Sequence, residues 1–499
     1  MKKFVFLSLI GFLILGMGAT SYAMDYKFRG LLDFSHIYGV NILNPPYEVT
    51  GNFWGDRVAS TSGYTGFRSA EDGARDKTRS YTTQRARLRF DAVASKELMG
   101  TIYFEMDSER WGEVSGDRNR TGYWMSDRAG VEVKNVYVTF GLPVIPVPTT
   151  MQVGIQPFQV RGITGYADGP GIQLALKPDP AQITLMWAKP YENEDFAADD
   201  NDIYAVKAEV KVQKASIGGY ILYYNMNSLP STGTITRTPA YRGGMGWYGL
   251  YVDGKLGPVD VNWDFVYDKG TVEDNRQNGP RNRDIDFSGW GTVLRVEYPW
   301  EKFNFGFLGV YGAGSDTKRT NQSGQPDGTA TSSGAVAKKV GGYVAPPGVE
   351  IGEDISLVWG TGGGGFSRAL TGYGASSSSY MQPGNIGGIW VAKLYVGFKV
   401  TPEYDVTLGG LYIGDTTKNG NTLFSPVKTG TATLRDDKSI GYEFDLLNTY
   451  QVYKNLKLMV GAGYLFALDG FDFCHDTIAG ENDSFKNPWT VHTRLTYVF

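Results

Sequence analysis

Cysteine is almost absent from this chain of 499 residues, since Cys474 is the only one. An internal disulfide is therefore excluded, and with it a small fold held together by disulfides. Cys474 is followed by His475, a pair that could be interpreted as part of a metal cluster. A zinc site needs several spaced ligands, which this segment lacks. An ordinary loop is the better interpretation, and we expect no metal here.

Long apolar runs are also scarce, apart from one at the N-terminus. Two lysines precede an apolar run from Phe4 to about Met17, and Ser21-Tyr22-Ala23 supplies small residues at the spacing of a cleavage site. This pattern predicts a cleaved secretory signal peptide over residues 1–23 and a mature chain that starts at Met24. No cysteine follows the expected cut, which disfavours a lipid anchor. No later stretch approaches the roughly 20 apolar residues that a transmembrane helix needs.

Charge and histidine are limited in ways that exclude further classes. The chain has 48 basic and 52 acidic residues, a formal net charge of −4, which argues against a nucleic-acid-binding protein. Its three histidines, His36, His475 and His492, are scattered, and no Ser-His-acid set or catalytic carboxylate pair can be identified. We therefore predict that the protein is not an enzyme and needs no cofactor. An alternative that stays open is a hydrolase built on a β-barrel, which would need a Ser/His or Asp/His set at the outer rim of the barrel.

What the chain has in abundance is alternation with a period of two residues. The last segment, Pro488 to Phe499, places mostly apolar side chains on one face, with an aromatic residue at each end, and mostly polar ones on the other. Successive side chains of a strand point to opposite sides of a sheet. An apolar outer face with aromatic ends, backed by a polar face, is typical of a strand that crosses a membrane in a barrel.

The same period recurs along the whole mature chain, and the sequence predicts 18 strands. They lie near residues 25–38, 81–94, 98–109, 131–142, 149–157, 171–177, 181–189, 203–213, 215–226, 245–254, 257–268, 287–298, 302–313, 387–400, 404–414, 438–450, 455–468 and 488–499. Short connections alternate with long ones. An even number of strands joined in this way predicts an all-β fold over 24–499. This would be a single transmembrane antiparallel β-barrel with short periplasmic turns, long extracellular loops and both termini on the periplasmic side. Closure of the barrel would satisfy every backbone hydrogen bond within the membrane.

Two of the expected loops are unusually long, over residues 39–79 and 314–386. The second is rich in Gly and Ser, and it could fold into the bore as a constriction or plug, or remain a surface loop. Its glycine run is not followed by Gly-Lys-Ser/Thr, so it is not a phosphate-binding loop. The acidic loop 191–202 could bind calcium, but its spacing fits no known loop motif and a solvated surface is the better interpretation.

The inward faces of the first strands are expected to be charged. Folding 81–94 onto 98–109 about the turn at 95–97 places Arg87 opposite Glu105. The same register places Arg85 opposite Asp107, and directly opposed charges of this kind attract. Arg89 falls opposite Tyr103 and so is predicted to lack a carboxylate across from it.

Closure of the barrel places the last strand beside the first. We therefore expect Arg494 and His492 to neighbour Lys27 and Arg29, which would make one arc of the lumen rich in cations. The residues predicted to line the pore are Lys27, Arg29, Arg85, Arg87, Arg89, Glu105, Asp107, Lys393, Glu443, Asp445 and Arg494. Further inward charges are expected at Lys207, Lys211, Asp260, Asp264, Arg295, Glu297 and Lys399.

Such a wall has two interpretations. Lysine and arginine at a pore favour anions, and a guanidinium can hold a carboxylate in bidentate geometry. Alternatively, the Arg–carboxylate pairs only brace the wall and keep the lumen wet, because exposed pairs contribute only about 0–1 kcal/mol each.

Several short motifs carry a resemblance to a known family. These are Arg85–Phe90 (RARLRF), Ser95–Leu98 (SKEL), Tyr103–Glu105 (YFE), Trp111-Gly112, Ile440–Leu446 (IGYEFDL), Asn455–Leu458 (NLKL) and Gly463–Leu465 (GYL). They resemble an early and a late hairpin of the alginate-export-like family of bacterial outer-membrane porins. The resemblance implies a monomeric 18-stranded barrel with a basic conduit for acidic polysaccharide. By position, Arg85, Arg87 and Arg89 with Glu105 and Asp107 match the charged wall of that family, and Glu443 with Asp445 matches its late acidic pair.

Together these features predict a porin of the outer membrane of a Gram-negative-type bacterium. It would pass hydrophilic and preferentially anionic solutes passively. The more specific prediction is that these solutes are acidic oligo- or polysaccharides. Its expected partners are outer-membrane lipid, the solute, and the barrel-assembly machinery, which would recognise the C-terminal strand ending at Phe499. The alternative from another class is a structural sleeve or scaffold whose lumen holds a partner protein.

Overall fold

The computed structural model describes most of the chain beyond the predicted signal peptide, which lies outside the described residues. The described residues are 24–41, 78–112, 130–164, 166–192, 200–229, 241–274, 285–314, 339–347, 356–358, 383–385, 389–416, 437–471, 473–474, 482–483 and 486–499. Within these ranges, no helix is both long enough and apolar enough to cross a membrane.

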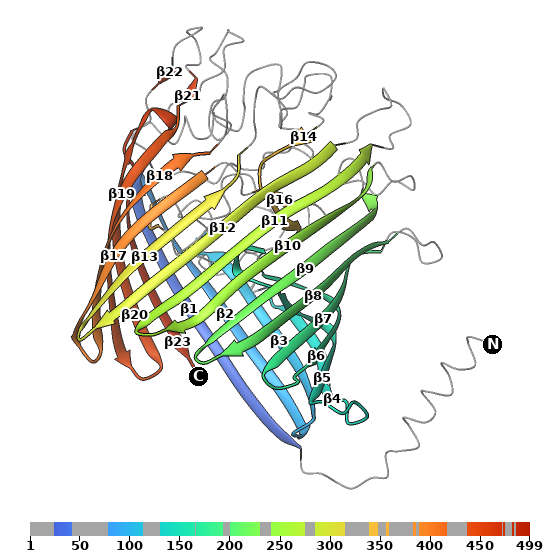
Figure 1. Ribbon diagram of the computed structural model, residues 1–499. Coiled ribbons are helices and arrows are strands. Elements are labelled where there is room, and N and C mark those ends of the chain that lie inside the picture. Colours follow the sequence, from blue (N-terminus) through green and yellow to red (C-terminus); the bar gives the residue numbers. More distant parts are fainter. Residues whose placement is uncertain are drawn as a thin grey trace.

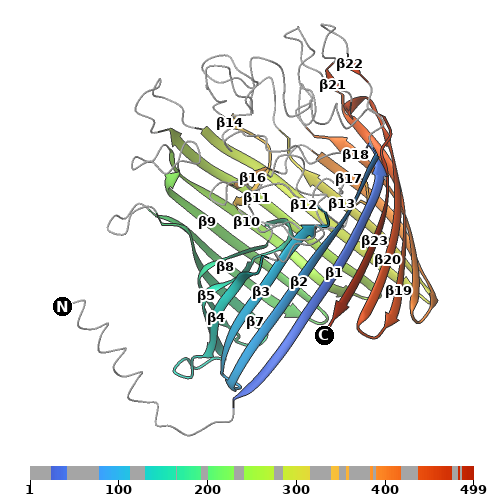
Figure 2. The same cartoon turned by 180° about the vertical axis from the view of Figure 1, so that it is seen from behind.

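Eighteen long strands pair antiparallel with their neighbours in sequence and close into one barrel (Figures 1 and 2). They are β1 (Asp25–Val40), β2 (Thr78–Ser95), β3 (Leu98–Arg110), β4 (Glu132–Gly141), β5 (Thr149–Gln159), β6 (Tyr166–Leu176), β7 (Ala181–Tyr191), β8 (Asn201–Val212), β9 (Ala215–Leu229), β10 (Tyr241–Leu256), β11 (Val259–Asp274), β12 (Ile285–Trp300), β13 (Phe303–Gly312), β17 (Ile389–Thr401), β18 (Tyr404–Asp415), β19 (Ser439–Tyr453), β20 (Leu456–Ala467) and β23 (Trp489–Val498). The seam joins β1 to β23, and it ends in two backbone hydrogen bonds between Gly30 and Phe499. The predicted number of strands and the predicted closure are confirmed.

Several strands are longer than the sequence predicted, at the ends away from the short turns. β10 begins at Tyr241 rather than near 245, and β11 continues to Asp274 rather than to 268. The prediction ended each strand where apolar alternation ends. Backbone pairing needs no apolar side chains, however, and so it continues above the band that faces lipid.

Small elements occupy the longer connections. Two short 3-10 turns are η1 (Gly162–Thr164) and η3 (Asp469–Phe471). The short strands are β14 (Lys339–Val340), which lies parallel beside β12, and two antiparallel pairs, β15 (Val344–Pro347) with β16 (Pro383–Asn385) and β21 (Phe473–Cys474) with β22 (Asn482–Asp483). Cys474 therefore lies in β21, whereas His475 is outside the described residues.

The short connections all lie at one end of the barrel, at the bottom of Figure 1, together with the start of β1 and the C-terminus. They are residues 96–97, 142–148, 177–180, 213–214, 257–258, 301–302, 402–403 and 454–455. In a barrel of the outer membrane this end faces the periplasm. The arrangement agrees with the predicted alternation of short and long connections.

The outer face of the wall is apolar and carries aromatic residues at two levels. Near the short turns, Tyr26 stacks on Phe90 at 5.4 Å between ring centroids, and Trp300 stacks on Phe303 at 6.1 Å. A second level lies toward the other strand ends. Its ring pairs are Tyr38–Trp489, Trp290–Tyr311, Trp390–Tyr412 and Tyr442–Phe466. Between the levels, outward aliphatic side chains such as Leu250 and Leu394 are exposed. Two aromatic girdles around an apolar band define a membrane-spanning barrel.

One close approach within the wall predicts a measurable loss of stability. Gly154 in β5 has a φ of +134°, and an added Cβ would lie 2.2 Å from the carbonyl oxygen of Val136 in β4. Gly154→Ala is therefore expected to cost about 1–3 kcal/mol of barrel stability, because the strained backbone and the neighbouring strand cannot move away cheaply. Samples would be incubated at increasing temperatures before electrophoresis in detergent. The temperature at which the compact, fast-migrating form disappears would report this cost. Gly100→Ala is the matched control, since no atom lies within 4 Å of the added Cβ. Equal transition temperatures for the two variants would contradict the prediction.

Candidate functional site

A cluster of cations lines the lumen along the first four strands. We call it the basic arc, and its members are Arg29, Arg85, Arg87, Arg89 and Lys134. These side chains point inward because alternate residues of a strand share a face, and the outward positions between them are apolar. Three carboxylates lie among the cations: Asp91, Glu105 and Asp168.

Glu105 of β3 is the centre of the arc. Its Oε1 lies 2.6 Å from Nε of Arg87 and 3.3 Å from Nε of Arg85, and its Oε2 lies 2.8 Å from Nζ of Lys134. The predicted pair Arg87–Glu105 is present. Arg85, predicted opposite Asp107, instead reaches Glu105, because a β-bulge between Gln84 and Ala86 shifts the register. The side chain of Asp107 lies outside the described residues.

Arg89 lies opposite Tyr103, as predicted, and has no carboxylate directly across from it, but it contacts one on its own strand. Its Nε donates to Oδ1 of Asp91, two residues along the same strand, at 2.8 Å. Asp91 also accepts from Arg29 at 2.5 Å and from the hydroxyl of Thr101 at 2.7 Å. The prediction considered only partners directly across the strand pair, whereas residues at i and i+2 share a face and can also meet. Lys27 lies opposite Asp91 in the register of β1 and β2.

Arg494 is also placed differently from the prediction. It grips Asp33 of β1 in bidentate fashion, with Nε 2.8 Å from Oδ1 and Nη2 2.7 Å from Oδ2. Strand stagger explains the difference, since β23 pairs with the later part of β1, from Leu31 onward. Arg494 therefore lies opposite Ser35, and His492 lies opposite Ile37. Neither lies beside Lys27 or Arg29, where the sequence predicted them.

Burial differs between the arginines of the arc and the two carboxylates that they contact, whereas Lys134 and Asp168 are about equally exposed, at 15% and 18%. The side chain of Arg29 is 60% exposed and those of Arg85, Arg87 and Arg89 are 25–29% exposed, whereas those of Asp91 and Glu105 are 0% and 8% exposed. The carboxylates lie against the wall and the guanidinium groups lie between them and the lumen. Further charged residues share this wall: Lys27 lies opposite Asp91, Asp33 lies opposite Arg85, and Glu132 lies opposite Glu105. The arginines are the more exposed partners in their pairs with Asp91 and Glu105.

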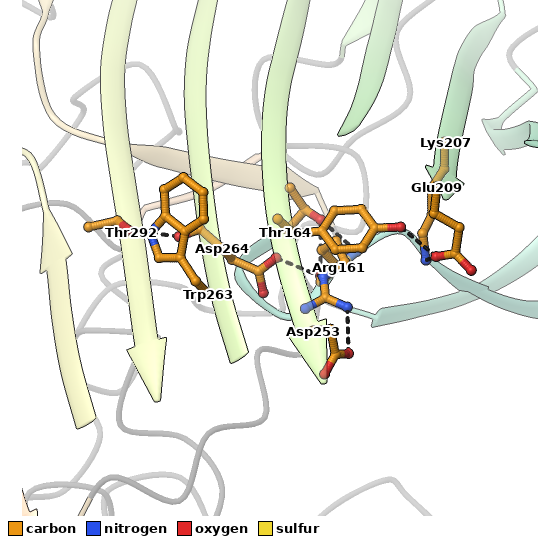
Figure 3. A network of polar contacts seen from close by, with 9 residues as sticks. Arg161, Thr164, Lys207, Glu209, Asp253, Trp263, Asp264 and Thr292 are labelled. Carbon is orange, nitrogen blue, oxygen red and sulfur yellow. Dashed lines mark hydrogen bonds and ion pairs between the residues drawn. The ribbon is translucent and has the colours of Figure 1, made fainter. Parts of the chain in front are cut away.

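A second network of polar contacts lies on the wall of the barrel opposite the basic arc. It involves β11, which is nine strands away from β2 in a barrel of eighteen strands. Its centre is Arg161, which follows β5 and reaches across to β10 and β11 (Figure 3). Nε of Arg161 lies 2.7 Å from Oδ1 of Asp264, and Nη1 lies 3.0 Å from Oδ2 of Asp253. The guanidinium carbon is 4.2 Å from the ring centroid of Tyr251, whose hydroxyl donates to Glu209 at 2.5 Å.

Burial tends to lower the pKa of Arg161, but the hydrogen bonds to Asp264 and Asp253 outweigh it and raise that pKa. Arg161 is therefore a fixed positive charge between two carboxylates. The inward position of Asp264 was predicted, whereas Arg161 was missed because it stands outside the alternating segments. The signal that could have found it is an arginine in a connection whose facing strands carry inward carboxylates.

Glu443 and Asp445, the acidic pair near the end of the chain, have different surroundings. Asp445 of β19 lies 3.1 Å from Nζ of Lys393, so two predicted pore residues meet. Glu443 is fully buried and does not face a wet lumen. Its carboxylate accepts hydrogen bonds from the hydroxyl of Ser356 and from the backbone N–H groups of Leu357 and Val358, all at 2.8–2.9 Å. The interpretation of Glu443 as a water-facing residue is therefore corrected, because a segment of the chain covers it.

Comparisons with known proteins find likeness in structure alone. No family model matches the chain, and no curated protein sequence matches it. Among solved structures, Pseudomonas aeruginosa OprD is 10% identical with a TM-score of 0.46, and the match covers 95% of each chain. Acinetobacter baumannii OccAB4 is 11% identical with a TM-score of 0.44, covering 95% of this chain and 98% of that one. A BenF-like porin from Pseudomonas fluorescens is 10% identical with a TM-score of 0.44 and the same coverage. None of these comparisons shows membership of the alginate-export-like family.

The opposite-wall network yields a prediction on stability. Asp264→Asn removes one of the two carboxylates that compensate the charge of Arg161, whose side chain is only 12% exposed. We expect a loss of about 1–3 kcal/mol in the free energy of unfolding, because a charged hydrogen bond is lost at a buried site. Urea titration of the barrel in detergent, followed by tryptophan fluorescence, would measure it.

The matched control for this change lies on the same face of the same strand. Asp260→Asn breaks a pair with Lys255 in which both side chains are 39–49% exposed, and its effect should stay within about 0.5 kcal/mol. A cost at residue 264 no larger than that at residue 260 would show that Arg161 does not depend on this contact.

Proposed function

We propose that the protein is a channel of the outer membrane that passes hydrophilic solutes passively and prefers anions. The observation that carries the proposal is the basic arc, where guanidinium groups are 25–60% exposed and the carboxylates that they contact, Asp91 and Glu105, are buried. Fixed charge along a pore wall raises the local concentration of the opposite ion, so such a wall favours anions. The closed wall and the two aromatic girdles support the membrane setting.

Acidic saccharide is the solute class that we propose within this function. Arg85, Arg87 and Arg89 follow one another at every second residue, which corresponds to steps of roughly 6.6–6.8 Å along the strand. A chain of sugars with repeated carboxylates can exchange one guanidinium for the next in such a row, and guanidinium binds carboxylate in bidentate geometry. The resemblance of the two hairpins to the alginate-export-like porins supports the same solute class.

The route to the membrane forms part of the proposal. Residues 1–23 would direct export and be cleaved, and the apolar C-terminal strand ending at Phe499 would be recognised by the barrel-assembly machinery. The partners would then be outer-membrane lipid and the solute, with no nucleic acid and no cofactor.

Ion selectivity tests this function directly. Purified protein in a planar bilayer under a potassium chloride gradient should show a reversal potential of the sign given by chloride preference, and oligouronate should block the current. Arg87→Ala combined with Arg89→Ala should roughly halve the ratio of chloride to potassium permeability and weaken the block, because two cations leave the arc. Single-channel recording of both proteins gives the two quantities.

Arg295→Ala provides the control for loss of positive charge elsewhere in the lumen, since Arg295 shares the inward face of β12 with Val293. Unchanged selectivity in the double variant, or an equal change in the control, would mean that the arc does not line the limiting path. Absence of any current in the wild-type protein would favour the structural sleeve around a partner.

A further inference from the structure

The lumen is filled on one side by the chain itself. Many inward side chains of β9–β13 and β17–β20 are buried, including Trp247, Phe287, Leu308, Ile413 and Leu465, each at 0–1% exposure. Nearer the short turns, inward Asp253, Lys255 and Asp260 remain 39–49% exposed. A barrel wall is a single layer, so an inward side chain can be buried to this degree only if something inside covers it. By contrast, the arginines of the basic arc, on β1 and β2, remain 25–60% exposed.

The cover comes from three described parts of the connections. Ile163 of η1, residues 343–345 around β15, and residues 357–358 belong to the same buried cluster or pack beside it. We call residues 343–345 and 356–358 the inner segments. The backbone of residues 342–343 lies close to the wall at Gly289 of β12. A Cβ added to Gly289 would be only 2.4 Å from the carbonyl oxygen of Gly342.

Polar contacts fix the inner segments at two places on the wall. At the first, Val344 lies between two strands: its N–H donates to Oδ2 of Asp268 in β11 at 3.3 Å, and its carbonyl accepts from the indole N–H of Trp247 in β10 at 2.7 Å. Tyr343 also donates to the carbonyl of Ile163 at 3.0 Å, which joins the inner segments to η1. This side of the cover is held by several independent bonds and by apolar packing.

At the second place, the contacts to residues 356–358 include the carboxylate of Glu443 in β19 and a hydrogen bond between His492 of β23 and the backbone of Leu357. Glu443 accepts from the hydroxyl of Ser356 and from two successive N–H groups, those of Leu357 and Val358. The side chains of Leu357 and Val358 lie against glycines of β20, and an added Cβ at Gly463 would be 2.8 Å from Cγ2 of Val358. Loss of the Glu443 carboxylate would remove these hydrogen bonds from a buried site, which is costly.

We propose that Glu443 is a latch that holds residues 356–358 against β19 and β20, and that this contact sets the width of the open path beside the basic arc. The inference rests on the proposed channel function. When the latch is removed, residues 356–358 leave the wall, because the hydrogen bonds to Glu443 no longer offset the freedom that the segment gains in water. The position of the inner segments, and not the bore of the barrel alone, then determines the conductance.

Two readouts test the latch, one of which needs no current. In a Cys474→Ser background, Val358→Cys places a nearly isosteric thiol at a site that is 1% exposed. Its reaction with a membrane-impermeant maleimide should be slow, and Glu443→Ala should accelerate it at least about tenfold, because several hydrogen bonds to one carboxylate are lost. Single-channel recording of Glu443→Ala should show larger or fluctuating conductance.

Glu297→Ala is the matched control, because Glu297 accepts a hydrogen bond from the hydroxyl of Tyr395 and holds no inner segment. It should change neither the reaction rate nor the conductance steadiness.

The outcomes separate the latch from the channel function. A thiol at 358 that reacts at the same rate with and without Glu443 overturns the latch, whatever the currents show. No current in the wild-type protein, combined with faster labelling of the Glu443→Ala variant, supports the latch and removes the open-channel function. Glu443→Leu, which is similar in size but has no acceptor, covers the case in which Glu443→Ala does not form the compact barrel; an unchanged labelling rate in the Leu variant also overturns the proposal.

Discussion

Closure of the wall is the constraint on which the rest of the molecule depends. Each of the eighteen strands finds partners on both sides because β23 returns to β1, and this leaves no unpaired edge in the membrane. Closure also fixes the stagger of the strands, and the stagger decides which charges meet. Arg494 grips Asp33 rather than neighbouring Arg29 for this reason alone. The electrostatics of the lumen thus follow from the register of a backbone ladder.

Alternation along single strands was enough to predict the architecture, because a strand in lipid must be apolar on its outer face whatever it faces inside. The inward position of Arg87, Glu105 and Asp264 followed from the same alternation. Register could not be predicted to the residue: the bulge near Arg85 leaves no mark in composition, and it moved that side chain from Asp107 to Glu105. Contacts such as that of Arg161 with β10 and β11 were also out of reach, because they depend on how a connection folds in three dimensions.

The two walls of the lumen use charge and apolar packing in opposite proportions. On β1 to β4, buried carboxylates contact a row of more exposed guanidinium groups, whereas on β9 to β13 many inward side chains pack as in the core of a soluble protein, beside the network of Arg161, Asp253 and Asp264. The polar inner face predicted for the strands is therefore present on only part of the second wall. Apolar residues on both faces of β10, such as Trp247 and Leu250, signal a covered wall in the sequence itself.

That double apolar character has a consequence for the life of the chain before it folds. The middle of β10 has little polar surface to present to water while the barrel is still open, since Met245, Trp247 and Tyr251 face the interior and Tyr248 and Leu250 face outward. Segments of this composition associate readily with one another when exposed. A chain that crosses an aqueous compartment unfolded would therefore depend, at β10 more than at β2, on holding chaperones that keep these residues apart until insertion.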